Sequence, residues 1–144
     1  AVGPIIAGAD KAGRNALKSS GMHLRLAFQL VDDALDYGGK AADLGKNVGD
    51  DFREGKITLP VIRHRRGTKE EREFWREAIE QGHNDDARLE KALGLIAKYG
   101  ALNDTIARAL HYGTIARDAL APLPETAWKS ALMDVIDFCI ARVN

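Results

Sequence analysis

The sequence predicts an all-α protein of about six to seven helices. Apolar residues recur three or four positions apart through most of its 144 residues, as they do along one face of a helix. Residues that start helices precede these stretches, and glycine or proline follows them. No segment shows the alternation of apolar and polar residues that is typical of a strand.

The start and stop signals place the elements in order. Helical patterns cover residues 2–8, 10–37 (with a start at Asp10 or Asn15), 59–66, 69–81, 87–99, 102–120 and 125–143. Pro4 marks a candidate break in the first of these, because proline removes a backbone donor. Thr68 and Glu71 form a predicted capping box, and Asp85 or Asp86 is expected to cap the following helix.

Three side chains at helical positions are expected to pack in the core. Trp75 and Trp128 are interpreted as packing residues. Cys139 is interpreted as a buried apolar residue and not as a nucleophile, because no histidine lies near it in the sequence. The predicted core side of the last helix holds Leu132, Val135, Ile136, Cys139, Ile140 and Val143.

Composition excludes several classes of function. The chain has 21 basic and 21 acidic residues, so its zero net charge gives no electrostatic basis for binding nucleic acid or an anionic membrane. No stretch approaches the roughly 20 apolar residues that a membrane span needs. The single cysteine excludes an intrachain disulfide and suits a reducing, cytoplasmic location.

The second helix carries a DDxxD box formed by Asp32, Asp33 and Asp36. At about 100° per residue, Asp36 lies about 40° and Asp33 about 100° from Asp32 around the helix. Three acids this close repel one another unless a cation lies between them, and Mg²⁺ prefers carboxylate oxygens completed by water and substrate phosphate. The competing interpretation is a solvated acidic face. The opposite, apolar side is formed by Leu24, Ala27, Phe28, Leu30, Val31, Ala34 and Leu35.

A glycine-rich loop with two lysines follows the DDxxD box. Glycines let a backbone turn tightly and approach a ligand closely. Lys46 and Lys56 offer positive charges to phosphate oxygens. Either lysine alone would be an ordinary surface residue, but behind the aspartates they predict a metal–diphosphate site. The loop glycines are Gly38, Gly39, Gly45, Gly49 and Gly55.

The stretches FQLVDDALDY (28–37) and LGKNVGDDFREGKITLP (44–60) resemble the second aspartate-rich region of the trans-prenyl diphosphate synthases, most closely the octaprenyl and decaprenyl branch. The resemblance implies a helical bundle of the isoprenoid synthase type. It also implies Mg²⁺, with Asp32 as a direct ligand and Asp33 and Asp36 as ligands or partners of metal-bound water. Asp51 would support the metal-bound waters.

The same resemblance implies the substrates, an allylic prenyl diphosphate and isopentenyl diphosphate, and a long-chain polyprenyl diphosphate as product. Lys46 and Lys56 would contact the diphosphate during catalysis. Phe28 and Gln29 would line the allylic site.

Two departures from the family pattern stand out. Arg25 in LRLAFQ occupies a position where the family usually has glycine, a departure that bears on either local packing or the shape of the pocket. The family's first aspartate-rich motif is absent, and the chain begins AVGPIIAGA without a methionine. We therefore expect residues 1–144 to be the carboxyl-terminal part of one synthase domain, an incomplete bundle that is inactive alone and homodimeric in the full-length enzyme.

Two alternatives from other classes remain at this point. A terpene cyclase also ionises allylic diphosphates with an aspartate-rich helix, but the KxT lysine and the GDD loop argue against it. The other alternative is a non-catalytic helical subunit of a prenyl synthase. The presence of all five residues of the predicted site argues against it: Asp32, Asp33, Asp36, Lys46 and Lys56.

Overall fold

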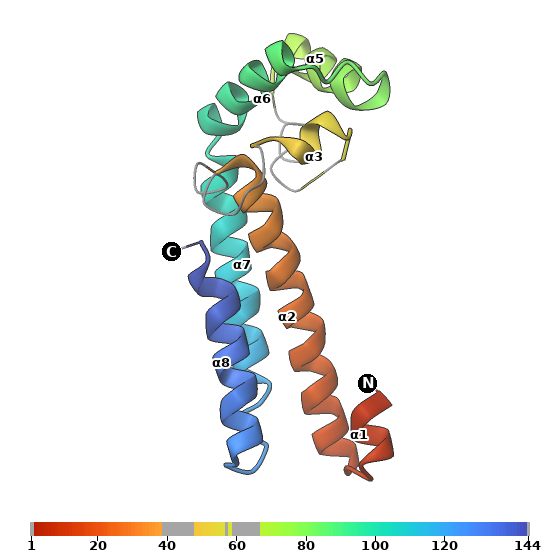
Figure 1. The fold of residues 1–144 in the computed structure, drawn as a ribbon, viewed down its shortest axis with the longest axis vertical. Helices are drawn as coiled ribbons and strands as arrows, with labels where there is room; N and C mark the ends of the chain where they lie inside the picture. The colour runs from red at the N-terminus through yellow and green to blue at the C-terminus, as the bar shows by residue number, and fades with distance from the viewer. Residues whose placement is uncertain (1, 39–47, 57, 59–66, 144) are drawn as a thin grey trace. The chain divides into compact units, whose positions relative to one another are not determined.

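A computed structural model describes residues 2–38, 48–56, 58 and 67–143 of the chain. Every regular element within these ranges is an α-helix, which confirms the predicted fold class (Figure 1). The helices are α1 (Val2–Ile6), α2 (Lys11–Tyr37), α3 (Asp50–Arg53), α5 (Lys69–Glu80), α6 (Asp86–Lys98), α7 (Ala101–Asp118) and α8 (Ala127–Ala141). The helix expected over 59–66 lies outside the described residues.

Two local predictions were wrong. Pro4 does not break the first helix but lies inside α1. Its place in the first turn explains this, because the backbone N–H that proline lacks has no helical partner there. The helix α3 was predicted as loop, since four residues are too few to leave a periodic pattern.

The chain divides into two compact units, and the first comprises residues 1–31 and 107–144. Its core centres on Ala116, Leu120 and Ile136. Helices α7 and α8 approach closely at Gly113, where an added Cβ would lie 2.6 Å from Cγ2 of Ile140. The expected burial of Cys139 is confirmed, with 4% of the residue exposed.

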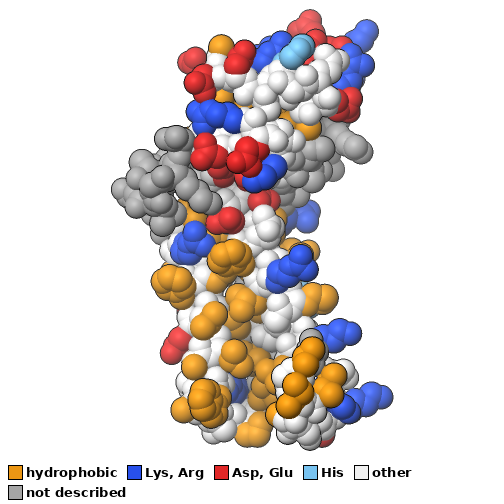
Figure 2. Space-filling model, turned by 45° about the vertical axis from the view of Figure 1, so that its right-hand side comes forward, with side chains coloured by type: hydrophobic (Ala, Val, Ile, Leu, Met, Phe, Trp, Pro, Cys, Tyr) orange, Lys and Arg blue, Asp and Glu red, His pale blue; other side chains and the backbone are white. Residues whose placement is uncertain are grey.

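The first unit also exposes much apolar surface, and hydrophobic side chains gather over its helices in Figure 2. Trp128 is 82% exposed, so its predicted packing role was wrong within the part of the chain described. Leu132 and Val135 of the expected core side are 39% and 52% exposed. The remaining large exposed hydrophobics of this unit are Val2, Ile5, Ile6, Met22, Leu26, Phe28 and Phe138.

The second unit, residues 32–106, has a core of its own. The predicted capping box is confirmed: Thr68 caps α5 and exchanges hydrogen bonds with Glu71. Asp85, one of the two expected caps, caps α6 through the N–H of Arg88. Trp75 is buried, as expected. The core of this unit contains Tyr37, Phe52, Phe74, Trp75, Ala78, Leu89, Ala92, Leu95, Ile96 and Ala101.

Gly49, which precedes α3, is predicted to be intolerant of any side chain. Its φ of +82° is left-handed, and an added Cβ would lie 2.3 Å from Cδ1 of Leu89. We expect Gly49→Ala to lower the free energy of unfolding by about 1–3 kcal/mol, through backbone strain and overpacking. Urea unfolding would measure this. The control Gly94→Ala, in open space within α6, should be neutral or more stable by up to about 1 kcal/mol. Equal effects of the two substitutions would contradict the prediction.

Glu71 links the start of α5 to the end of α6. Its carboxylate accepts hydrogen bonds from Nζ of Lys98 (2.6 Å), the hydroxyl of Tyr99 (2.6 Å) and the N–H of Thr68 (2.8 Å). The bond from Lys98, followed by those from Tyr99 and Thr68, lowers the pKa of Glu71 to about 2.

We therefore predict a stability contribution that depends on acid pH. The pKa of Glu71 is about 2 in the folded chain and 4.5 ordinarily, so the folded state binds fewer protons and the contribution is complete above pH 4.5. It should disappear as the pH falls towards 2. Glu71→Gln should lower the urea midpoint at pH 7, and its difference from the unchanged protein should shrink between pH 4.5 and 2. The exposed neighbour Glu70, changed to Gln, should show no such pH-dependent difference.

Candidate functional site

The three aspartates of the DDxxD box lie in the last two turns of α2. Asp33 and Asp36 are buried, with 6% and 7% of each residue exposed, and Asp32 is half-buried. On the predicted apolar side, Val31 and Ala34 are buried, as expected, whereas Phe28 is 50% exposed, so its predicted place on the buried side was wrong within the described residues. The box is therefore not a solvated acidic stripe, because two of its three carboxylates are withdrawn from water.

Asp36 connects α2 to the segment that carries Asp50 and Asp51. Its Oδ2 accepts the backbone N–H of Asp51 at 3.1 Å. Its backbone carbonyl accepts the N–H of Gly49 at 2.8 Å. These two hydrogen bonds fix the start of α3 beside the last turn of α2, so Asp51 is held next to the DDxxD box.

Lys56 belongs to the same hydrogen-bonded group. Its backbone N–H donates to the carbonyl of Asp51 at 2.8 Å, and its Nζ lies 3.4 Å from Oδ1 of Asp51 and 2.5 Å from Oε2 of Glu54. The hydrogen bond to Glu54, and then the one to Asp51, raise the pKa of Lys56. The ammonium group therefore stays charged, and at 58% exposure its side chain remains accessible to a ligand.

A buried phenol lies close to these acids. Burial is the main cause that raises the pKa of Tyr37, the nearby Thr58 hydroxyl opposes the rise, and the carboxylates of Asp36, Asp51 and Asp33 add to it. Tyr37 therefore remains protonated through the physiological range, and the negative charge of this region belongs to the carboxylates alone.

The structure thus joins Asp36, Asp51 and Lys56 in one hydrogen-bonded group. Lys46 lies outside the described residues. Phe28 is 50% exposed and Gln29 is exposed, both on α2 within the first unit.

Two polar residues that support the site were not predicted. Glu54 forms an ion pair with Lys56. The only sequence feature that could have indicated this pair is the position of Glu54 two residues before the lysine. The side-chain amide of Asn84 donates to the carbonyls of Phe52 (3.1 Å) and Arg53 (2.7 Å), more than 30 residues earlier. No local pattern could have identified that contact.

The donor set suits a magnesium ion held together with phosphate. Within the described ranges, no group of three or more Asp, Glu, His or Cys side chains is arranged to hold a metal ion by itself. Mg²⁺ usually takes one or two carboxylates and completes its shell with water and substrate phosphate. One oxygen of Asp36 already accepts the Asp51 N–H, which suits Asp36 to orienting metal-bound water, whereas Asp32 is the most exposed of the three aspartates.

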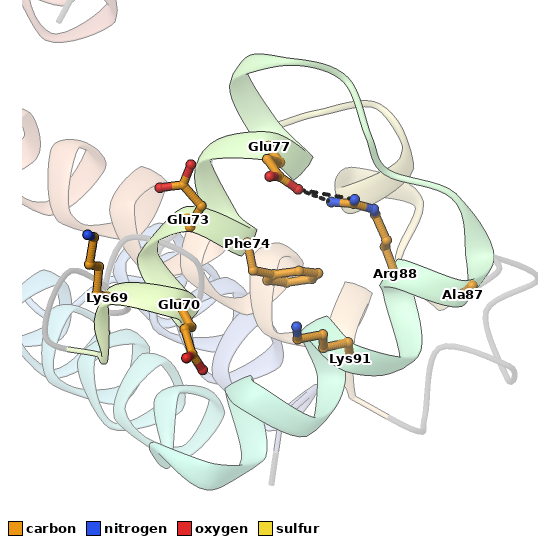
Figure 3. A pocket seen from close by; sticks show the side chains of 8 residues that line it. All are labelled: Lys69, Glu70, Glu73, Phe74, Glu77, Ala87, Arg88 and Lys91. Carbon is orange, nitrogen blue, oxygen red and sulfur yellow. Dashed lines mark hydrogen bonds and ion pairs between the residues drawn. The ribbon is translucent and has the colours of Figure 1, made fainter.

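A concave surface of about 780 Å³ lies between α5 and α6 (Figure 3). The ring of Phe74 forms its floor, with Nζ of Lys91 4.7 Å from the ring centroid. Glu77 and Arg88 close one side through an ion pair at 3.1 Å. None of the predicted site residues lines this groove.

Comparison with known proteins gives the class to which this chain belongs. A family model described as polyprenyl synthetase matches residues 1–96. The octaprenyl diphosphate synthase of Haemophilus influenzae is 40% identical over 139 residues, which cover 96% of this chain and 42% of that protein. This chain belongs to the polyprenyl synthetase family.

Solved structures agree. A decaprenyl diphosphate synthase from Rhodobacter capsulatus superposes with a TM-score of 0.90 at 46% identity, over 99% of this chain and 44% of that one. A polyprenyl synthase from Caulobacter crescentus, complexed with calcium and isoprenyl diphosphate, gives a TM-score of 0.81 at 45% identity, again over 99% and 44%. The chain thus spans less than half the length of the relatives that it matches. No helix in the described part of the chain is both long and apolar enough to cross a membrane.

Proposed function

We propose that this chain supplies the metal–diphosphate site of a trans-polyprenyl diphosphate synthase. The enzyme would extend an allylic prenyl diphosphate with isopentenyl diphosphate to a long-chain product. The observation that carries the proposal is the hydrogen-bonded group of Asp36, Asp51 and Lys56, which joins the acidic end of α2 to the lysine-bearing loop. Membership of the polyprenyl synthetase family supports the same reaction class.

In this proposal the aspartates divide the work of holding Mg²⁺. Asp32 would bind the ion directly, and Asp33 and Asp36 would bind it or its waters. Asp51, whose backbone N–H donates to Asp36, would support the metal-bound waters. When bound, Mg²⁺ supplies Lewis-acid stabilisation of the diphosphate leaving group.

Lys46 and Lys56 then contact the diphosphate and stabilise the negative charge that develops as the carbon–oxygen bond breaks. Lys56 has to exchange its contact with Glu54 for one with phosphate, and both side chains are exposed enough to allow this. Phe28 and Gln29 line the allylic site. The double bond of isopentenyl diphosphate attacks the allylic cation, and the released diphosphate takes the proton that leaves.

We further propose that the 144 residues alone do not turn over. The sequence contains one DDxxD box, and the relatives that it matches are more than twice as long. We also propose that the active enzyme is a homodimer.

Calorimetric titration with farnesyl diphosphate tests the proposal. Saturable binding of farnesyl diphosphate is expected with Mg²⁺ and not in excess EDTA. Incubation of the chain with both diphosphates should yield no product that is longer than farnesyl diphosphate. Equal binding with and without the metal would overturn the proposed site. Normal chain elongation would overturn only the claim that the chain is inactive alone.

A further inference from the structure

Helix α3 ends in a turn that determines where the chain places Lys56. The N–H of Lys56 donates to the carbonyl of Asp51 at 2.8 Å. The N–H of Gly55 donates to the carbonyl of Phe52 at 3.0 Å, and its φ is +69°, so the two bonds form a Schellman motif. A helix of four residues has little stability of its own, because nucleation costs more than one turn of hydrogen bonds returns. The position of Lys56 therefore depends on contacts that hold this turn from outside.

The side chain of Asn84, in the connection between α5 and α6, supplies such contacts. Its Nδ2 donates to the carbonyl of Phe52 at 3.1 Å and to the carbonyl of Arg53 at 2.7 Å. The last carbonyls of a helix lack the partners that a further turn would provide, so an external donor is needed there. Nδ2 also lies 3.6 Å from the place that a Cβ on Gly55 would occupy. The amide thus lies directly against the turn.

The backbone of Asn84 is itself fixed by the helices on both sides. The preceding residue, His83, donates its N–H to the carbonyl of Glu77 in α5 at 3.1 Å. The following residue, Asp85, caps α6 by accepting the N–H of Arg88 at 2.9 Å. The connection and α3 both belong to the second unit. Asn84 therefore has the fixed position that a residue needs if it is to hold another segment in place.

We propose that Asn84 is a positioning residue of the metal–diphosphate site, and that it holds the turn before Lys56 without contacting the ligand. The inference rests on the proposed function for the identity of the ligand. An amide suits this role because Nδ2 carries two N–H donors, and two carbonyls accept from it. A side chain without donors would remove both hydrogen bonds. The turn could then move, and the ammonium group of Lys56 would move relative to the aspartates.

Native-state hydrogen exchange tests this role without any ligand. Asn84→Ala should speed exchange of the Gly55 and Lys56 amides by roughly three- to tenfold, because the turn opens more often, while the amide of Ala92 in the middle of α6 keeps its rate. The control Gln81→Ala removes an exposed side-chain amide at the end of α5 and should change none of these rates. Unchanged exchange at Gly55 and Lys56 in Asn84→Ala would overturn the proposal, and so would an equal increase at Ala92, which would mean a general loss of stability.

Calorimetric titration with farnesyl diphosphate and Mg²⁺ tests the effect on the site. Asn84→Ala should weaken binding by roughly three- to tenfold, and Gln81→Ala should leave the affinity unchanged. In a Lys56→Gln background most of the effect of Asn84→Ala should vanish, because the lysine through which Asn84 acts is absent. An equal loss in both backgrounds would overturn the positioning role.

The same titrations separate this inference from the proposed function. If Lys56→Gln weakens binding and Asn84→Ala does not, only the role of Asn84 is overturned. If Lys56→Gln leaves the affinity unchanged, the proposed contact of Lys56 with the diphosphate is wrong, and the role of Asn84 at the ligand is overturned with it.

Discussion

Asp32→Asn should reduce Mg²⁺-dependent binding of farnesyl diphosphate by roughly 100-fold or more, since it removes the charge of the proposed direct metal ligand. Asn keeps the shape of the side chain, and Asp32 is only half-buried, so the fold should survive. Asp36→Asn should lose less, roughly 10–100-fold, because Asp36 acts by holding the loop and orienting water. Calorimetric titration at fixed Mg²⁺ measures both losses.

The matched control for this series is Asp134→Asn. Asp134 is an exposed aspartate on α8, so the substitution makes the same charge change at a helical position outside the predicted site. It should leave the affinity for the diphosphate unchanged. If the Asp32 and Asp134 variants bound equally well, Asp32 would not be a metal ligand and the proposed site would lose its central residue.

Phe52→Ala should cause the largest loss of stability, about 3–5 kcal/mol, because it leaves a cavity in the core of the second unit. Phe52 is fully buried, is the one buried residue of α3, and packs edge-on against Trp75 with ring centroids 6.1 Å apart. Urea unfolding followed by circular dichroism measures the loss. Diphosphate binding should also weaken, because α3 positions the neighbouring Asp51.

Phe138→Ala provides the same chemical change at a residue that is 73% exposed, and it should alter stability by no more than about 0.5 kcal/mol. A similar small effect at Phe52 would mean that α3 is not anchored through this ring. Retention of full diphosphate affinity in a destabilised Phe52→Ala variant would separate the position of α3 from ligand binding.

Local interactions explain which features could be predicted from the sequence. The capping box of Thr68 and Glu71 involves residues three positions apart, and both of its hydrogen bonds are present. The buried side of α2, including Ala27 and Val31, follows directly from helical periodicity. The fold class was predictable for the same reason.

Long-range interactions explain most of what could not be predicted. The hydrogen bonds that Glu71 makes with Lys98 and Tyr99 span 27 and 28 residues, so no pattern within α5 encodes them. Trp128 has the helical spacing of a core residue, and whether such a side chain is covered depends on neighbours that its own helix does not specify. In the candidate site, the residue types were predictable, but the way in which Asp36 holds Asp51 was not.

The contacts of Asn84 and Asp86 with α3 have a consequence for how the site could be tuned. The Asn84 amide holds two α3 carbonyls, and Asp86 pairs with Nε of Arg53 at 2.8 Å. Substitutions at these two positions would shift the positions of Asp51 and Lys56. The residues that contact a ligand would themselves remain unchanged. Laboratory selection for altered diphosphate affinity should therefore recover changes in the α5–α6 connection as well as in the aspartates and lysines.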